Sequence, residues 1–121
     1  MDGWDVLVSS EFEAWHQSLS ESEQRSLDVS ILVLSSEGPR LGRPHVDSVQ
    51  GSRHSNMKEL RTQHKGRPVR TFFAFDPNRA AILLIGGDKT GDNRFYQRLI
   101  PVADRILDRH IEQVREVTDG D

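Results

Sequence analysis

Three basic side chains lie where strand-length runs of the sequence begin or end, and together they could bind an anion. Arg61 closes one such run, Arg70 opens the next, and Lys89 closes the third. If the runs pair as neighbouring strands, the three cations converge. Guanidinium and ammonium groups gathered in this way stabilise the negative charge of a phosphate. Glu59 would share a strand face with Arg61, because side chains in a strand alternate with a period of two.

The segment that must position these groups, 54–89, has the pattern of an antiparallel β-meander. Runs at 57–61, 70–76 and 81–89 are separated by short polar turns, and the last two are rich in aromatic or β-branched residues. The third run is apolar on both faces, which is typical of a central strand. The glycines at its end would let another backbone or a ligand approach closely.

Helices are expected on either side of this meander. Alternating apolar residues predict a first strand within 1–9. Two Ser-x-x-Glu patterns, which begin at Ser10 and Ser20, are capping boxes at the starts of two helices. We therefore expect a helical hairpin over 10–38, which ends at the Gly-Pro pair that begins with Gly38.

The remaining segments complete one predicted α+β domain over 1–121. Residues 40–55 are rich in Gly, Pro, Ser and His and are expected to form a surface connection. Residues 93–115 carry an apolar helical face that should cover the sheet, with a kink or a new helix start at Pro101. The tail, 116–121, is expected to fray.

Charge is distributed unevenly along the chain, whose net charge is −3. The balance is −7 in residues 1–39, +6 in residues 40–70 and −2 in residues 71–121. The basic band in the middle could neutralise phosphates locally, or it could be solvated surface charge. The overall sign argues against a protein that coats nucleic acid without specificity.

Composition also bounds the compartment and the cofactors. The chain has no cysteine, which excludes disulfides and favours a reducing cytosol. No signal peptide pattern or membrane-spanning apolar run is visible, so we expect a soluble cytoplasmic protein with no membrane association. His45, His54 and His64 lack the spacing of metal ligands, so we expect no metal site and no cofactor.

Several of these segments closely resemble the phage-related branch of the RelE/HigB toxins of bacterial type II toxin-antitoxin modules. The resemblance covers about residues 57–111 and is carried by five motifs: KELR at 58–61, RTFFAFDP at 70–77, AILLIGGDK at 81–89, FY at 95–96 and IPVAD at 100–104. It implies the α+β, RelE-like fold, in which a small twisted, mainly antiparallel sheet carries two N-terminal helices on one face and a C-terminal helix.

The resemblance also implies a function, that of a metal-independent endoribonuclease (mRNA interferase). Such toxins cleave messenger RNA, in many relatives on the ribosome, by attack of the 2′-hydroxyl on the adjacent phosphorus, which leaves a 2′,3′-cyclic phosphate. Arg61 and Arg70 match the phosphate clamp, Lys89 the cation at the strand end, and Tyr96 an aromatic that stacks on a base or exchanges a proton. Lys58, Lys65 and Arg67 are the expected further contacts to RNA.

The proton carriers are less defined than the phosphate ligands. Tyrosine and lysine act as bases near pH 7 only if neighbouring cations lower their pKa, and Arg61 and Arg70 could supply that field. Glu59 is either the base or a structural carboxylate paired with Arg61, and the pairing is the simpler role. Histidines serve in some relatives, and His54 or His64 could flank the site.

The resemblance further implies a partner, a helix-turn-helix antitoxin encoded beside the toxin. The acidic helical hairpin, with Glu11, Glu13 and Glu21, is a candidate surface for it. The chain departs from many such toxins in its low sequence pI of 5.9. Two alternatives therefore stay open: a gyrase inhibitor of the ParE type without nuclease activity, and a noncatalytic module whose basic band binds an acidic protein.

Overall fold

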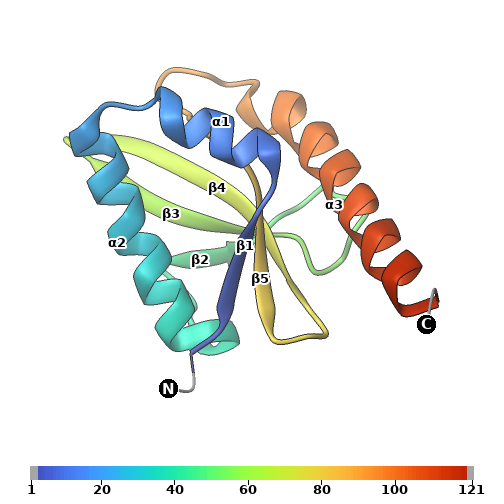
Figure 1. Cartoon of the computed structure of the whole chain (residues 1–121). Coiled ribbons are helices and arrows are strands. Elements are labelled where there is room, and N and C mark those ends of the chain that lie inside the picture. Colours follow the sequence, from blue (N-terminus) through green and yellow to red (C-terminus); the bar gives the residue numbers. More distant parts are fainter. Residues whose placement is uncertain (1–2, 120–121) are drawn as a thin grey trace.

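The computed structural model describes residues 3–119, which form three α-helices and five strands (Figure 1). In chain order the elements are β1 (Asp5–Val8), α1 (Ser10–Ser18), α2 (Glu21–Glu37), a 3-10 turn (Gly38–Arg40), β2 (Val46–Ser48), β3 (Lys58–His64), β4 (Arg67–Asp76), β5 (Ala80–Asp88) and α3 (Phe95–Asp119). No helix in this part of the chain has the length and apolar character to cross a membrane.

The five strands form one sheet in the order β1-β5-β4-β3-β2. Strands β3, β4 and β5 are consecutive antiparallel neighbours, whereas β1 pairs with β5 in parallel. The predicted mainly antiparallel α+β fold is therefore confirmed. In the β3–β4 register Arg61 lies directly opposite Arg70.

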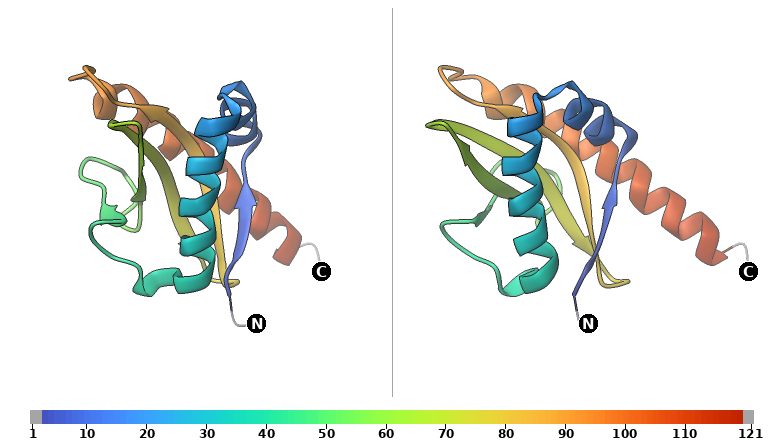
Figure 2. Two further views of the ribbon diagram at one scale, coloured as in Figure 1. Left: turned by 90° about the vertical axis from the view of Figure 1, so that its left-hand side faces the viewer. Right: turned by 60° about the vertical axis from the view of Figure 1, so that its left-hand side comes forward.

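Helices cover both faces of the sheet, α1 and α2 on one side and α3 on the other (Figure 2). Two cores result, and β4 contributes to both, because Phe72 lies in the α3 core and Phe73 in the core beneath α1 and α2. The α3 core also contains Met57, Ala74, Ile82, Leu84, Phe95, Leu99, Ile100, Ala103, Ile106 and Leu107. This division follows the two-residue alternation of the strand side chains.

The start of each N-terminal helix depends on a serine. Ser20 and Glu23 form the predicted capping box of α2. For α1 the prediction was wrong by one residue, because the N-cap is Ser9 and not Ser10. The Ser9 hydroxyl accepts from Phe12 N at 2.9 Å and donates to the Leu84 carbonyl at 2.6 Å. The bond to β5 selects Ser9, because it satisfies a buried carbonyl while the helix is capped.

The structure corrects the expectations in three further places. The connection over 40–55 contains a short strand, β2, which pairs with the start of β3. Helix α3 continues through Pro101, so that no new helix begins there; because Pro101 is exposed, water can replace the missing amide donor. Residues 116–119 of the predicted frayed tail continue α3, and 120–121 lie outside the described residues.

Candidate active site around Glu59

Glu59 is the buried centre of a cluster that joins β3, β4 and α3. Its Oε2 accepts a hydrogen bond from Arg61 Nε at 3.0 Å and lies 3.9 Å from Arg70 Nε. Its Oε1 accepts a hydrogen bond from Tyr96 Oη at 2.7 Å. The side chain of Glu59 is only 4% exposed, so both oxygens are used within the protein. One carboxylate thus binds the Arg61 guanidinium and the Tyr96 phenol and forms a longer ion pair with Arg70.

Arg61 is shared between two carboxylates. Besides its bond to Glu59, its Nη2 lies 3.1 Å from Asp47 Oδ2 on β2. Asp47 also accepts two bonds from Arg43, at 3.0 and 3.2 Å. The pKa of Asp47 is lowered, first by the bond from Arg43, then by the amide of Ser48, with a smaller contribution from Arg61. Because Arg61 remains 34% exposed, it can still meet a ligand from solvent.

Arg70 is more deeply placed than Arg61, with 11% of its side chain exposed. Its Nη1 donates to the carbonyl of Val69 at 3.1 Å. Its Nε is buried and has no hydrogen-bond partner among the described residues, because Glu59 is too distant to accept. Buried donors in proteins usually have partners. The Arg70 guanidinium is therefore held near the cluster without being fully satisfied by it.

Tyr96 and Lys89 complete the cluster. The Lys89 ammonium lies 5.3 Å from the centre of the Tyr96 ring, a cation–π geometry. Burial, followed by the hydrogen bond to Glu59, raises the pKa of Tyr96 above the usual value of 10.0, and the opposing effect of Arg70 is smaller. The expectation that cations lower this pKa was therefore wrong. The phenol stays protonated at neutral pH and can only donate a proton.

The cluster brings together five of the residues singled out from the sequence, but not the other three. Lys58 begins β3 and lies opposite Phe73, and Lys65 is exposed in the β3–β4 turn. Arg67 pairs with Glu23 of α2 at 3.1 Å and with Asp88 at 3.6 Å. These three basic residues do not contact Glu59, and Arg67 is joined to the acidic helix instead.

The histidines are distributed differently from the expectation. His64 is buried, and its Nδ1 lies 2.7 Å from the Ser26 hydroxyl of α2, whereas His54 is bound to α3. His45 borders the same cavity as Arg61 and Arg70 and was not singled out for this site. Its carbonyl accepts from Arg61 N at 2.8 Å, which places it beside the cluster. A three-residue strand, β2, creates this proximity, and such a short strand has no detectable periodicity.

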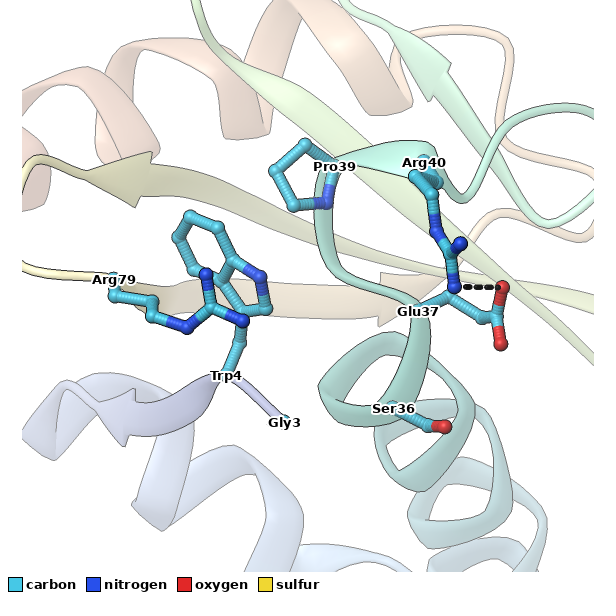
Figure 3. A pocket seen from close by; sticks show the side chains of 7 residues that line it. All are labelled: Gly3, Trp4, Ser36, Glu37, Pro39, Arg40 and Arg79. Atoms are coloured by element: carbon cyan, nitrogen blue, oxygen red, sulfur yellow. Dashed lines mark hydrogen bonds and ion pairs between the residues drawn. The ribbon is translucent and has the colours of Figure 1, made fainter. Parts of the chain in front are cut away.

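Two cavities border residues of the cluster. One of about 660 Å³ is lined by both arginines together with His45, Ser26 and Ser30, and one of about 420 Å³ is lined by Tyr96. A cavity of about 750 Å³ lies elsewhere, between Trp4 and the end of α2 (Figure 3). Its wall includes Arg79, whose guanidinium carbon lies 5.0 Å from the centre of the Trp4 ring. None of the predicted site residues lines this third cavity.

Comparisons with known proteins identify the family of the chain. The family described as phage-derived protein Gp49-like (DUF891) matches residues 14–108. HigB2 of Mycobacterium tuberculosis, assigned as a toxin, is 43% identical over 116 residues, which are 94% of this chain and 57% of HigB2. HigB3 of the same organism, also assigned as a toxin, is 46% identical over 101 residues, which are 83% of this chain and 87% of HigB3. The chain thus spans little more than half the length of HigB2.

Two solved structures share the fold at low sequence identity. An arginine-to-alanine double mutant of the E. coli toxin RelE, in the free state, aligns with a TM-score of 0.57 at 9% identity and covers 88% of this chain and 97% of its own. A chain of the toxin-antitoxin complex RelBE2 of M. tuberculosis aligns with a TM-score of 0.55 at 11% identity. The alignment covers 71% of this chain and 98% of that chain. The resemblance stated from the sequence is confirmed. The chain therefore belongs to the Gp49-like family, as a homologue of the RelE/HigB-type toxins with a RelE-like fold.

Proposed function

We propose that this protein is the toxin of a toxin-antitoxin module and that it cleaves messenger RNA without a metal ion. The observation that carries the proposal is the arrangement of two opposed arginines and a protonated phenol around one buried carboxylate. Two guanidinium groups can bind the oxygens of a phosphodiester while the phenol supplies a proton. The relatives assigned as toxins support the same function.

The reaction needs a base for the 2′-hydroxyl, an acid for the leaving 5′-oxygen and positive charge around the phosphorus. The 2′-oxygen attacks the adjacent phosphorus, the bond to the 5′-oxygen breaks, and the products are a 2′,3′-cyclic phosphate and a 5′-hydroxyl. The phosphorane that forms on the way gathers negative charge, which Arg61 and Arg70 would stabilise through charge-assisted hydrogen bonds. Arg61 is accessible from solvent, and Arg70, with 11% of its side chain exposed, lines the same cavity.

Tyr96 is the proposed acid that protonates the departing 5′-oxygen. Its raised pKa keeps the phenol protonated at neutral pH, which an acid requires. The phenolate left after proton transfer would be stabilised by Lys89, whose ammonium lies over the ring, and by Arg70. Lys89 thus contributes positive charge and does not itself act as the base.

Glu59 would position the other groups, because both of its oxygens are engaged and its side chain is buried. A hydroxyl of the substrate could reach Glu59 only if its bonds to Arg61 and Tyr96 were broken.

His45 is the proposed base that removes the 2′-hydroxyl proton. It borders the arginine cavity, and imidazole is the side chain most often used for proton transfer.

The proposed partner is an antitoxin, a proposal supported by the structural similarity to the toxin-antitoxin complex RelBE2. Its helix-turn-helix class, and the ribosome as the place of cleavage, follow from the family resemblance. The acidic helices α1 and α2 remain the candidate surface. Glu11 is unsuitable for testing it, because Glu11 is bound by Arg109 of α3. Glu13 and Glu21 are the better positions for charge reversal in a pull-down with the antitoxin.

Pulse expression in bacteria followed by sequencing of RNA 5′ ends tests the proposed function. Wild-type protein should stop growth and generate new 5′ ends within messages, and Arg61→Ala and Arg70→Ala should abolish both effects. Arg105→Ala, at an exposed position of α3, is the matched control and should cleave like the wild type. Intact transcripts together with DNA damage would instead identify a gyrase inhibitor, and no effect on RNA or DNA would favour the interaction module.

A further inference from the structure

The cavity of about 420 Å³ beside Tyr96 lies between the loop that joins β2 to β3 and the first turns of α3. Gln50 and Gly51 line it from the loop, and Gln97 and Ile100 line it from the helix. The two glutamines are exposed, whereas Ile100 is buried. The cavity therefore has an apolar floor and two amide side chains at its rim.

The loop side of the cavity is fixed to α3 by hydrogen bonds to two aspartates of the helix. Asp104 is 3% exposed, and its carboxylate accepts from the Ser52 hydroxyl at 2.5 Å and from Arg53 N at 3.1 Å. One turn further along, Asp108 accepts from Arg53 and lies 2.7 Å from His54 Nε2. These bonds form the cavity before any ligand arrives, which lowers the entropic cost of binding.

The charges around the cavity favour a neutral ligand. Its one basic side chain, Arg53, is paired with Asp108 and lies 4.0 Å from Asp104, so that little positive charge remains for a phosphate. Arg61 and Arg70, the side chains proposed to bind the phosphate, line the other cavity. Tyr96 lines the present cavity and is hydrogen-bonded to Glu59, which binds Arg61, so a base in this cavity would lie close to a phosphate held by the arginines.

We propose that this cavity binds one nucleobase of the RNA, that of a nucleotide next to the cleaved phosphate, and that Gln50 and Gln97 recognise its edge. This inference rests on the proposed function and names a part of its substrate. An amide has both a donor and an acceptor, as recognition of a base edge requires, and an aromatic ring at the wall suits an unstacked base. The volume is sufficient for a single nucleotide and too small for a duplex.

The first test compares cleavage sites. RNA 5′ ends are sequenced after pulse expression of the wild type, Gln97→Ala, the Gln50→Ala/Gln97→Ala double variant and Gln113→Ala. Gln113 is an exposed amide on the same helix outside the cavity, so its variant is the matched control. The wild type and the control should share a base preference at one position beside the cut. The two cavity variants should weaken that preference about tenfold or more, the size of the loss expected for one amide–base pair.

The second test needs no cleavage and so separates the two proposals. NMR titration of the wild type with AMP, CMP, GMP and UMP should shift the amide signals of residues 50–53 and 96–101, most strongly for the preferred base. Gln97→Ala should weaken this binding, and Gln113→Ala should not. If the wild type leaves RNA intact but these shifts appear, the proposed nuclease activity is wrong and the proposed base-binding cavity is supported. Cleavage with an unchanged base preference in the cavity variants, or shifts confined to other residues, would overturn the cavity proposal.

Discussion

Tyr96 donates a 2.7 Å hydrogen bond to Glu59, so that α3 is joined to β3 at the centre of the candidate site. The contact has a measurable consequence, because the negative charge of Glu59 contributes to the raised pKa of the phenol. Tyr96 is the single tyrosine of the sequence, so absorbance of phenolate reports this residue alone.

We predict that Tyr96 of the folded wild type titrates above pH 10 and that Glu59→Gln lowers its midpoint. The amide can still accept from the phenol, but it no longer repels a phenolate. The same variant should lose about 2 kcal/mol of stability, less than a fully buried ion pair would lose, because Arg61 is 34% exposed. Glu13→Gln is the control, and an equal midpoint in both variants would refute the role given to Glu59.

The raised pKa also predicts how stability depends on alkaline pH. The folded protein holds the phenol proton more tightly than the unfolded chain, because the pKa is higher in the folded state. This contribution is fully present below about pH 10 and is lost as the pH rises through the folded pKa. Urea unfolding at increasing pH should therefore show a smaller alkaline loss for Tyr96→Phe than for the wild type.

The ion pair between Glu11 and Arg109 should make stability depend on pH in the acidic range. Arg109 holds the pKa of Glu11 down at about 2, and its two hydrogen bonds, at 2.6 and 2.9 Å, join α1 to α3. The contribution is present above the ordinary pKa of 4.5 and disappears as the pH falls toward 2. Since the Glu11 side chain is 36% exposed, we expect under about 1 kcal/mol.

Thermal melts between pH 6 and pH 2 can measure this pair. Glu11→Gln should melt lower than the wild type at pH 6, and the two curves should approach each other toward pH 2. Glu13→Gln carries the same change on the same helix at an exposed position and should follow the wild type throughout. A difference that persists at pH 2 would show that packing, and not charge, is responsible.

The fold and much of the cluster could be predicted because strand alternation and turn spacing are local. Alternation alone places Glu59 with Arg61 on one face, and the short turn between β3 and β4 sets Arg61 opposite Arg70. Lys89 could be predicted from its place at the end of a strand-length run, whereas Tyr96 required the family resemblance, because nothing in its own segment indicates that α3 returns across the strand ends.

What could not be predicted depends on contacts between distant segments. The local pattern favours Ser10, which has Glu13 three residues later, and only the bond from Ser9 to the Leu84 carbonyl explains why Ser9 is the cap. The three residues of β2 have too little pattern to be recognised, and pairing with β3 forms the strand. His45 and Asp47 were missed for this reason, although both lie beside Arg61.

The proposed role of His45 gives a kinetic prediction. His45→Gln should lower kcat for RNA cleavage by roughly a hundredfold or more, the usual size of a lost proton transfer, and leave RNA binding nearly unchanged. His16→Gln, on α1 and outside this cavity, should behave like the wild type. Equal losses of binding and turnover in His45→Gln would make the residue a contact to RNA and return the role of base to Glu59.

Gly86 tests how the sheet supports this site. A Cβ atom there would lie 2.3 Å from the Trp15 ring and 2.9 Å from the carbonyl oxygen of Arg70. The close approach expected at the end of this strand therefore serves packing against α1 and pairing with β4. Because the Arg70 carbonyl belongs to the backbone, Gly86→Ala must displace strand β4 or Trp15. We expect a loss of stability of about 2–3 kcal/mol and a loss of cleavage, since Arg70 moves with its strand.

The matched variant is Gly42→Ala, because an added Cβ there meets no atom within 4 Å. It should keep both its melting temperature and its cleavage activity. If Gly86→Ala melts lower but cleaves normally at a temperature where it is fully folded, the backbone of Arg70 tolerates the displacement. The guanidinium position would then be set by Glu59 alone, and Glu59→Gln should cause the greater loss of cleavage of the two variants.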